Sequence, residues 1–326
     1  MEPPRLSLGF FPTPIHRLDR VSADLGIDLW IKRDDLSGLA LGGNKVRKLE
    51  YLLASAVAQG CDTIVTCGGL HSNFIRILAA GCAKLGLRCV ATVMELPFED
   101  EEPSGERLNP TNGNPRLSRL FGAELREFPN GAWEELYEHG AEAARAEESD
   151  GRSVYSIPIG GSSPLGAYAF WKAGQEVIAS GESFDWIVTA SSSGSTQTGL
   201  TYAFAGTNTN ILGICSDPEP EMVHELDQLG VGLSALLSCP ALTWRDFRLN
   251  LDHVGSGYGI PSQEGDEAIR YLAEKEGILL DPIYTGKAFA GMLQLINCQS
   301  IGGRVLFWHT GGAPSVFAQG FLRVLG

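Results

Sequence analysis

Short apolar runs alternate with helical patterns along almost the whole chain. Runs rich in valine and isoleucine predict strands at 62–68, 88–94, 153–157, 186–190, 210–215 and 304–308. Apolar residues at helical spacing predict helices at 73–85, 115–121, 132–147, 165–180, 221–237, 263–276 and 287–300. Strand, turn, helix and strand follow one another in the βαβ order. Because this order needs crossover connections, we expect an α/β fold with mostly parallel sheets covered by helices on both faces.

The size and charge of the chain narrow its class. With 326 residues, 44% hydrophobic and 20% charged, it is long enough for a soluble globular protein of two subdomains. The formal net charge of −14 argues against a nucleic-acid or anionic-membrane partner, because both would be repelled. No export signal and no apolar stretch of membrane-spanning length is visible in the sequence.

The cysteines indicate a compartment. Seven of them are scattered without a C-x-x-C pair, which favours reduced thiols in the cytoplasm over a disulfide framework. The six histidines show no ligand spacing with these cysteines, so we do not expect a metal site.

A glycine turn before an apolar helix carries the first candidate chemistry. The glycine pair at 42–43 precedes Asn44 and Lys45, and apolar residues at helical spacing follow from Leu49 onwards. Glycines let the backbone turn sharply and approach a ligand closely. A lysine held on such a turn can form a Schiff base with a carbonyl cofactor. For this motif alone, a solvated lysine before an ordinary helix is an equally good interpretation.

Two further turns follow predicted strands and open helices. Ser72 and Asn73 come after the strand at 62–68, where free backbone N–H groups and the helix dipole suit a carboxylate. Helix capping by either residue is compatible with that role. The serine-rich segment 191–199 has the composition of a phosphate cradle, although a flexible serine-rich loop accounts for it equally well. It lacks a Walker A ending and a G-x-G-x-x-G fingerprint, which disfavours a dinucleotide.

Two segments near the end of the chain complete the candidate residues. Tyr284 has a ring that can stack on a flat cofactor and a hydroxyl that can transfer a proton, with Thr285 as a neutral neighbour. A lone tyrosine before a helix is more often a packing residue. His309 and Thr310 end the strand at 304–308, and ligands in such folds bind beyond the carboxyl ends of the strands.

Seven motifs stand in one order along the chain: GGNKVRKLE, GGLHSN, IPIGGSSPLGA, GSTQTG, GYGIP, LDPIYTGKA and LFWHTGGAP. In this the chain resembles pyridoxal-phosphate enzymes of fold type II, most closely the branch of 1-aminocyclopropane-1-carboxylate (ACC) deaminases and D-cysteine desulfhydrases. The resemblance runs from about Pro12 to Phe321. It implies pyridoxal 5′-phosphate as cofactor and a homodimer. It also implies a large cofactor-binding domain at 1–47 and 157–326 and a small α/β domain at 48–156.

The resemblance further implies roles for individual residues. Lys45 is expected to be the Schiff-base lysine and, once free, the base for the substrate Cα proton. The phosphate is expected at the start of the serine-rich segment, on Ser193, Gly194, Ser195 and Thr196. The other expected cofactor contacts are Asn73 at the phenolic oxygen, Thr285 beside the pyridine nitrogen, and Thr310. The substrate is expected to meet His71, Ser72, Asn73, Tyr258 and Tyr284, with Ser72 at its carboxylate.

The residue beside the pyridine nitrogen indicates the substrate. The deaminase pattern has a glutamate there, whereas this chain has Thr285, as the desulfhydrases do. A neutral partner suits α,β-elimination better than cyclopropane ring opening. We therefore expect a deaminating lyase of the D-cysteine desulfhydrase type, giving pyruvate, ammonia and sulfide.

Some residues depart from the desulfhydrase pattern and keep other substrates open. His71 stands where both groups usually have glutamine, and Phe74 where desulfhydrases usually have histidine. The segment Gly194-Ser195-Thr196-Gln197 looks more like the deaminase phosphate loop. The alternatives are ACC deamination, elimination from another β-substituted amino acid such as cysteate, and a cofactor-carrying protein without catalysis.

Overall fold

The computed structural model describes residues 2–98, 101–216 and 222–319. The strands in these residues are β1 (Ile15–Arg17), β2 (Asp28–Arg33), β3 (Thr63–Gly69), β4 (Arg88–Met94), β5 (Glu124–Phe128), β6 (Val154–Ser156), β7 (Trp186–Ser191), β8 (Asn210–Cys215), β9 (Arg248–Asn250) and β10 (Arg304–His309). The α-helices are α1 (Asp19–Leu25), α2 (Lys45–Ala58), α3 (Asn73–Leu85), α4 (Asn114–Leu120), α5 (Trp133–Ser149), α6 (Pro164–Ala179), α7 (Ser195–Ala203), α8 (Met222–Leu237), α9 (Gln263–Glu276) and α10 (Thr285–Asn297).

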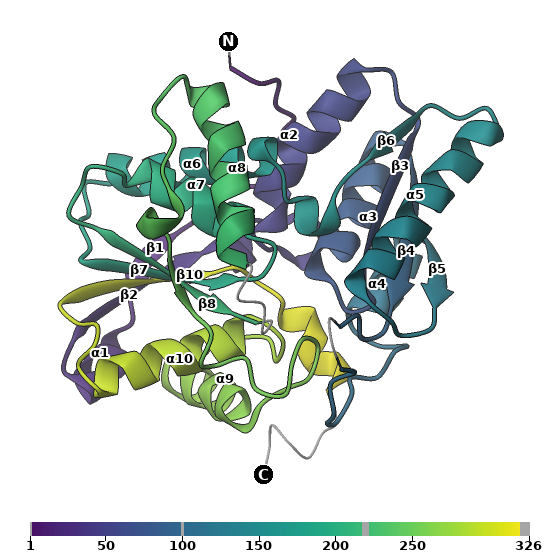
Figure 1. Cartoon of the computed structure of the whole chain (residues 1–326). Helices are drawn as coiled ribbons and strands as arrows, with labels where there is room; N and C mark the ends of the chain where they lie inside the picture. The colour runs from purple at the N-terminus through teal and green to yellow at the C-terminus, as the bar shows by residue number, and fades with distance from the viewer. Residues whose placement is uncertain (1, 99–100, 217–221, 320–326) are drawn as a thin grey trace.

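The strands form two sheets that lie side by side (Figure 1). The larger has six strands in the order β1-β2-β10-β7-β8-β9, and the smaller has four in the order β5-β4-β3-β6. Among these strands every pairing is parallel except that of β1 with β2. The α/β fold with mostly parallel sheets, predicted from the βαβ order, is confirmed.

Helices cover both faces of the smaller sheet because successive strand residues point to opposite sides. Ile64 of β3 packs into a core shared with α2 and α3, to which Leu53 and Ile77 belong. The next residue, Val65, packs on the other face with Ala143 of α5. Both faces are therefore apolar, which explains why the strands of this sheet appear in the sequence as continuous apolar runs.

The larger sheet is covered in the same way. On β10, Phe307 packs with Phe289 of α10, in a core that also takes residues from α1 and α9. The preceding Leu306 packs with Phe170 of α6 and Leu200 of α7. Helix α8 lies outside α6 and α7 in Figure 1, and Leu226 joins it to their outer side. We call each sheet with its covering helices a unit, the larger unit around the six-stranded sheet and the smaller around the four-stranded sheet. Helix α2 contacts α3 of the smaller unit and α6 of the larger one, so it connects the two units.

Each predicted strand and helix has a counterpart within a few residues. The predicted helix start at 221 and the end of the resemblance at Phe321 lie outside the described residues. The strands of the smaller sheet all fall between residues 63 and 156, in keeping with the division at 47/48 and 156/157, which stays a prediction. The structure adds the helix α1 and the strands β1, β2, β5 and β9.

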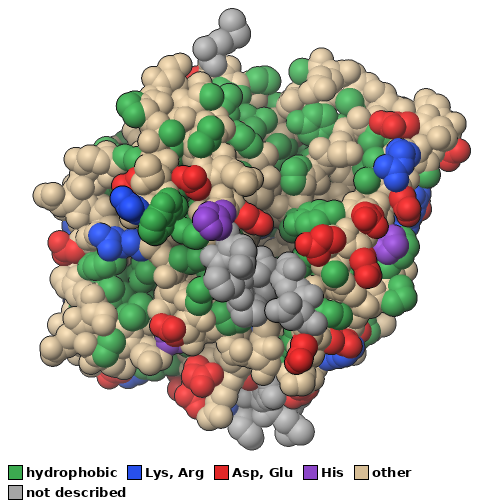
Figure 2. Space-filling view, viewed as in Figure 1, with side chains coloured by type: hydrophobic (Ala, Val, Ile, Leu, Met, Phe, Trp, Pro, Cys, Tyr) green, Lys and Arg blue, Asp and Glu red, His purple; other side chains and the backbone are tan. Residues whose placement is uncertain are grey.

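Part of the negative charge lies on the exposed surface of α5. Acidic side chains on the outer face of α5 are exposed, among them Glu134, Glu135, Glu138 and Glu142. Figure 2, viewed as in Figure 1, shows acidic side chains on the side of the molecule where α5 lies. The excess charge is therefore solvated, as expected for a globular surface.

Candidate active site

Lys45 is the first residue of α2 and is positioned by a turn that only glycines can make. Gly42 and Gly43 have positive φ angles of 75° and 134°. A Cβ added to Gly42 would lie 1.8 Å from the carbonyl oxygen of Asp35. The backbone N–H of Asn44 donates to the carbonyl oxygen of Thr310 at 2.9 Å, which ties the turn to the end of β10.

A cavity between the two units collects residues from turns that are far apart in the sequence. Most of the predicted site residues line it: Lys45, Ser72, Asn73, Ser193, Gly194, Thr196, Tyr258, Tyr284 and Thr310. Three predicted residues do not line it: His71, Ser195 and Thr285. The turns before α2, α3, α7 and α10 thus converge, as expected for an α/β fold whose ligand sites lie at strand ends.

Burial gives Lys45 an unusually acidic amine. Burial lowers the pKa of Lys45 to about 8, opposed in part by a hydrogen bond with Lys48. Burial, together with the nearby charge of Lys45, also lowers the pKa of Lys48 well below its ordinary value. An amine with a pKa near neutrality is a competent nucleophile toward a carbonyl group and a competent proton acceptor.

The N-terminus of α3 is suited to a carboxylate. The hydroxyl oxygen of Ser72 accepts from the backbone N–H of Phe74 at 3.2 Å, so Ser72 caps the helix. Capping uses an oxygen lone pair and leaves the hydroxyl hydrogen able to donate. The first turn of α3 carries no acidic residue, so the positive end of the helix dipole is not neutralised locally.

The N-terminus of α7 fits a phosphate. Gly194 has a positive φ of 82° and precedes the helix, and the buried hydroxyl of Ser195 has no hydrogen-bond partner among the described residues. The amide of Asn44 donates to the Thr196 hydroxyl oxygen at 3.1 Å. An unpartnered buried hydroxyl at a helix N-terminus is costly unless a ligand satisfies it. These residues therefore fit the phosphate of pyridoxal phosphate, although the Ser195 side chain does not line the cavity.

Lys48 is a site residue that the sequence analysis did not identify. It is fully buried, and its Nζ donates to the carbonyl oxygen of Gly160 at 3.0 Å. Gly160 lines the cavity, and a Cβ added to it would lie 2.5 Å from the hydroxyl of Ser193. Lys48 thus lies near the serine-rich turn. Its only sequence signal is the spacing of three residues from Lys45, which places both on one side of a helix.

Two tyrosines form a hydrogen-bonded pair at the cavity. The hydroxyl groups of Tyr258 and Tyr284 are 2.6 Å apart, so one phenol donates to the other. The Tyr258 ring packs edge-on against Trp133 of α5 at 5.3 Å between ring centroids. A Cβ added to Gly69 would lie 2.8 Å from the same ring, so glycine is required there. Trp133 also lines the cavity and had no distinguishing sequence pattern.

Thr285 directs its hydroxyl away from the cavity toward a buried carboxylate. The hydroxyl donates to Asp281 Oδ2 at 2.6 Å and accepts from the Asp281 backbone N–H at 2.7 Å. Its predicted place beside the pyridine nitrogen stays a prediction. His71 is buried next to Ser72, and burial lowers the pKa of its ring to about 4, so the ring is neutral at neutral pH.

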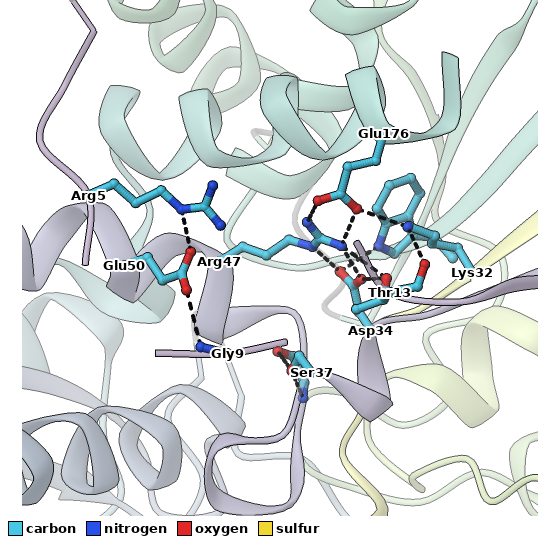
Figure 3. Close-up of polar contacts among 11 residues, drawn as sticks. Arg5, Gly9, Thr13, Lys32, Asp34, Ser37, Arg47, Glu50 and Glu176 are labelled. Atoms are coloured by element: carbon cyan, nitrogen blue, oxygen red, sulfur yellow. Dashed lines mark hydrogen bonds and ion pairs between the residues drawn. The ribbon is translucent and has the colours of Figure 1, made fainter. Parts of the chain in front are cut away.

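A network of charged groups anchors α2 to its neighbours (Figure 3). The guanidinium of Arg47 donates to both carboxylate oxygens of Asp34 at 2.8 and 2.9 Å and to both of Glu176 at 2.7 and 2.9 Å. The Nζ of Lys32 donates to Glu176 at 2.9 Å, and the indole of Trp308 donates to Asp34 at 2.8 Å. This network joins α2, α6, β2 and β10 two residues after Lys45.

Known proteins similar to this chain agree with the geometry. The sequence profile of the pyridoxal-phosphate dependent enzymes matches residues 6–311. A D-cysteine desulfhydrase of Yersinia enterocolitica is 40% identical over 332 residues, covering 97% of this chain and 96% of the relative. The crystal structure of an ACC deaminase homologue superimposes with a TM-score of 0.87 at 34% identity, covering 97% of this chain and 94% of that chain.

A more distant likeness supports the fold alone. The crystal structure of O-ureido-L-serine synthase superimposes with a TM-score of 0.64 at 21% identity, covering 97% of this chain and 93% of that chain. The profile match and the 40% identical relative extend over nearly all of the sequence. The chain belongs to the family of pyridoxal-phosphate dependent enzymes.

Proposed function

We propose that the protein catalyses α,β-elimination from D-cysteine or a close relative, giving pyruvate, ammonia and hydrogen sulfide. The observation that carries the proposal is the D-cysteine desulfhydrase that is 40% identical over 97% of the chain. The cavity supports it, because a lysine whose pKa is lowered to about 8 faces two helix N-termini and a pair of phenols. The protein is a pyridoxal-phosphate-dependent lyase, and the proposal concerns its substrate and the roles of its residues.

The cofactor would be held at three points. Lys45 would bind its aldehyde carbon covalently, the turn at 193–196 with Lys48 would hold its phosphate, and Asn73 would donate to its phenolic oxygen. When bound, pyridoxal phosphate supplies a conjugated ring that accepts the negative charge left at the substrate Cα.

The substrate would be oriented by α3 and deprotonated by Lys45. Its carboxylate would accept hydrogen bonds from the Ser72 hydroxyl and from backbone N–H groups at the start of α3. The Lys45 amine, when it is not bonded to the cofactor, would accept the Cα proton. A pKa of about 8 keeps a usable fraction of that amine neutral near physiological pH.

The leaving group would be protonated by the tyrosine pair. As the Cβ–S bond breaks, its electron pair goes to sulfur, and the phenol of Tyr258 or Tyr284 donates a proton to it. The second phenol, 2.6 Å away, stabilises the phenolate that remains until Lys45 returns a proton. The released 2-aminoacrylate tautomerises, and water then converts it to pyruvate and ammonia.

The second candidate is ACC deamination, because the ACC deaminase homologue superimposes over 97% of this chain. Thr285 disfavours it. Its hydroxyl hydrogen is donated to Asp281 at 2.6 Å, so the oxygen has no hydrogen left to donate toward a ring nitrogen. Elimination from cysteate, a substrate that carries a second anionic group, is a third candidate.

One screen separates these candidates. Release of 2-oxo acid should be measured with both enantiomers of cysteine, serine, β-chloroalanine and cysteate, and with ACC. We expect the highest kcat/KM with D-cysteine. A higher kcat/KM with ACC would overturn the substrate assignment, and no 2-oxo acid from any compound would favour a cofactor carrier.

The role of Lys45 is tested by the cofactor's absorption. Lys45→Ala should lose the visible band of the covalently bound cofactor and all turnover, because Lys45 is the lysine of this turn that lines the cavity. Lys84→Ala, which changes an exposed lysine on α3, is the control and should keep both. An unchanged band in Lys45→Ala would point to Lys48.

The proposal extends to a homodimer in the cytoplasm. The cysteines form no disulfide within the described residues, as expected for thiols in a reducing compartment. No helix in the described part of the chain has the length and apolar character needed to cross a membrane. Light scattering of the purified protein would measure the mass, and that of a single chain, 35.0 kDa, would contradict the dimer.

A further inference from the structure

Asn114 lies where the two units meet beside the cavity. It is the first residue of α4 and is fully buried. The preceding Gly113 has a positive φ of 63°, and a Cβ added to it would lie 2.8 Å from the carbonyl oxygen of Pro314. The start of α4 therefore packs directly on the backbone of the 3₁₀ segment Ala313–Ala318, which follows the β10 turn.

The side-chain amide of Asn114 joins three segments. Its Nδ2 lies within hydrogen-bond distance of three acceptors, which share its two N–H groups: the backbone carbonyl of His71 at 2.6 Å, Oδ1 of Asn73 at 2.8 Å and the hydroxyl oxygen of Ser315 at 3.0 Å. Two of these acceptors belong to the turn that opens α3, and the third lies in the larger unit. One buried amide thus couples the carboxylate-binding turn to the segment after β10.

These contacts determine which way the amide of Asn73 faces. A backbone carbonyl can only accept, so the Asn114 atom that faces His71 must be the amide nitrogen. The Asn73 atom that faces the same nitrogen must then be its oxygen. The Nδ2 of Asn73 is then on the side away from Asn114, where a Cβ added to Gly312 would lie 2.8 Å from it, and Asn73 lines the cavity.

We infer that Asn114 is a positioning residue that holds Asn73 with its amide N–H group, rather than its oxygen, presented to the cofactor. The inference rests on the proposed contact of Asn73 with the phenolic oxygen of pyridoxal phosphate. That oxygen is an acceptor when ionised, so a donor at this position favours its ionised form, whereas a carbonyl oxygen would disfavour it. Asn114 thereby determines whether Asn73 presents a hydrogen-bond donor or an acceptor to the cofactor, without contacting the cofactor itself.

The decisive variants are Asn114→Ala, Asn114→Asp, Asn73→Ala and the double variant Asn73→Ala/Asn114→Ala. Asn114→Asp keeps the size but replaces the donor with an acceptor, so it should turn the Asn73 amide around. Ser118→Ala is the matched control, because Ser118 is buried on the same helix and its hydroxyl donates to the backbone carbonyl of Asn114 at 2.9 Å. Each protein is measured for cofactor dissociation constant, for the pH titration of the bound cofactor's absorption band, and for the Tm of the apoprotein.

We expect Asn114→Ala to weaken cofactor binding by roughly tenfold, the size of one hydrogen bond to a charged group. Asn114→Asp should raise the pH at which the absorption band titrates. The double variant should bind the cofactor within about twofold of Asn73→Ala, because Asn114 acts through Asn73. Ser118→Ala should bind it within about twofold of the unmodified protein, whatever its Tm.

Two results would overturn the inference while leaving the proposed function intact. They are additive losses in the double variant, and a titration of the band that is unchanged in Asn114→Asp. If Asn114→Ala does not fold, the absorption titration of Asn114→Asp decides. An Asn73→Ala protein with unchanged cofactor affinity and unchanged band would instead contradict the proposed contact of Asn73.

Discussion

Replacing Arg47 by methionine tests whether the charged network behind Lys45 is needed for stability. Methionine keeps much of the length of the side chain and removes its charge and all of its hydrogen bonds. Among the described residues, Asp34 would be left fully buried with the side-chain donors of Thr13 and Trp308, and Glu176 would keep Lys32. Breaking a buried ion pair by removing one partner costs about 3–5 kcal/mol, because the other charge is left uncompensated. We expect a loss in this range, dominated by Asp34, since the Glu176 side chain is 21% exposed and can be rehydrated.

The pH dependence of the loss identifies its cause. In the unmodified protein burial opposes ionisation of Asp34, but the charge and hydrogen bonds of Arg47 outweigh it and hold the pKa of this carboxyl below its usual range. Such a group stabilises the fold above its unfolded pKa and loses that contribution as pH falls through its folded pKa. Without Arg47, burial dominates and the pKa is raised. The variant then takes up a proton on folding. The difference in unfolding free energy between the unmodified protein and the variant should therefore shrink as pH falls from about 7.5 to about 5.

Urea denaturation of the apoproteins at both pH values measures the loss. Arg119→Met is the control, because Arg119 and Glu127 form an ion pair with side chains 42% and 55% exposed, and such pairs contribute about 0.2–1 kcal/mol. Arg47→Lys keeps the charge but loses the planar guanidinium, so its loss of unfolding free energy should lie between those of Arg47→Met and Arg119→Met. The reasoning is refuted if Arg47→Met loses less than about 1 kcal/mol, or loses equally at both pH values.

Three further predictions concern the cofactor and the substrate. Replacing Ser195 and Thr196 together by alanine should weaken cofactor binding by roughly tenfold or more with the fold intact, and unchanged affinity in equilibrium dialysis would place the phosphate elsewhere. Because only the neutral amine attacks the aldehyde, the rate at which apoprotein attaches the cofactor should rise with pH up to about 8 and then level off, following the lowered pKa of Lys45. A rate that keeps rising up to pH 10.5, the ordinary pKa of lysine, would contradict the lowered pKa of Lys45. Thr285→Glu should narrow or reverse the preference for D-cysteine over ACC, and an unchanged ratio of kcat/KM values would show that this position does not set it.

The fold could be predicted largely because both sheets are buried on both faces. Strands such as β3 and β10 therefore appear as apolar runs, and the helices between them show clear periodicity. The strand β2 was missed because Lys32 and Arg33 interrupt its apolar pattern. Lys32 is nevertheless fully buried, since Glu176, far along the chain, pairs with it. The missed strands β1 and β9 are three-residue segments whose existence depends on a neighbouring strand.

Site residues that lie on glycine-rich turns could be predicted from the sequence, whereas residues whose role depends on tertiary packing could not. Glycines and hydroxyl residues at strand ends mark the turns of Lys45, Ser72 and the serine-rich segment, whatever the rest of the fold does. Lys48 lies inside helical sequence and Asn114 is the first residue of α4, where asparagine is an ordinary residue, so nothing local distinguishes either of them. Their importance comes from Gly160 and from Ser315, which are joined to them only by the tertiary structure.

The chain has a net charge of −14, yet its proposed cofactor and substrate both carry anionic groups. The electric field at the site itself explains how such a chain can bind anions. The first turns of α2, α3 and α7 carry no acidic residue, so three positive helix ends point toward the cavity without compensation. The carboxylates of Asp34 and Glu176, which contact α2 through Arg47, are engaged by Arg47 and Lys32. The acidic excess lies on exposed surface such as α5, where water and salt screen it. Anion binding here therefore depends on backbone dipoles and two buried lysines whose charge is itself reduced by burial. Such a site can hold a phosphate and still leave Lys45 neutral enough to react.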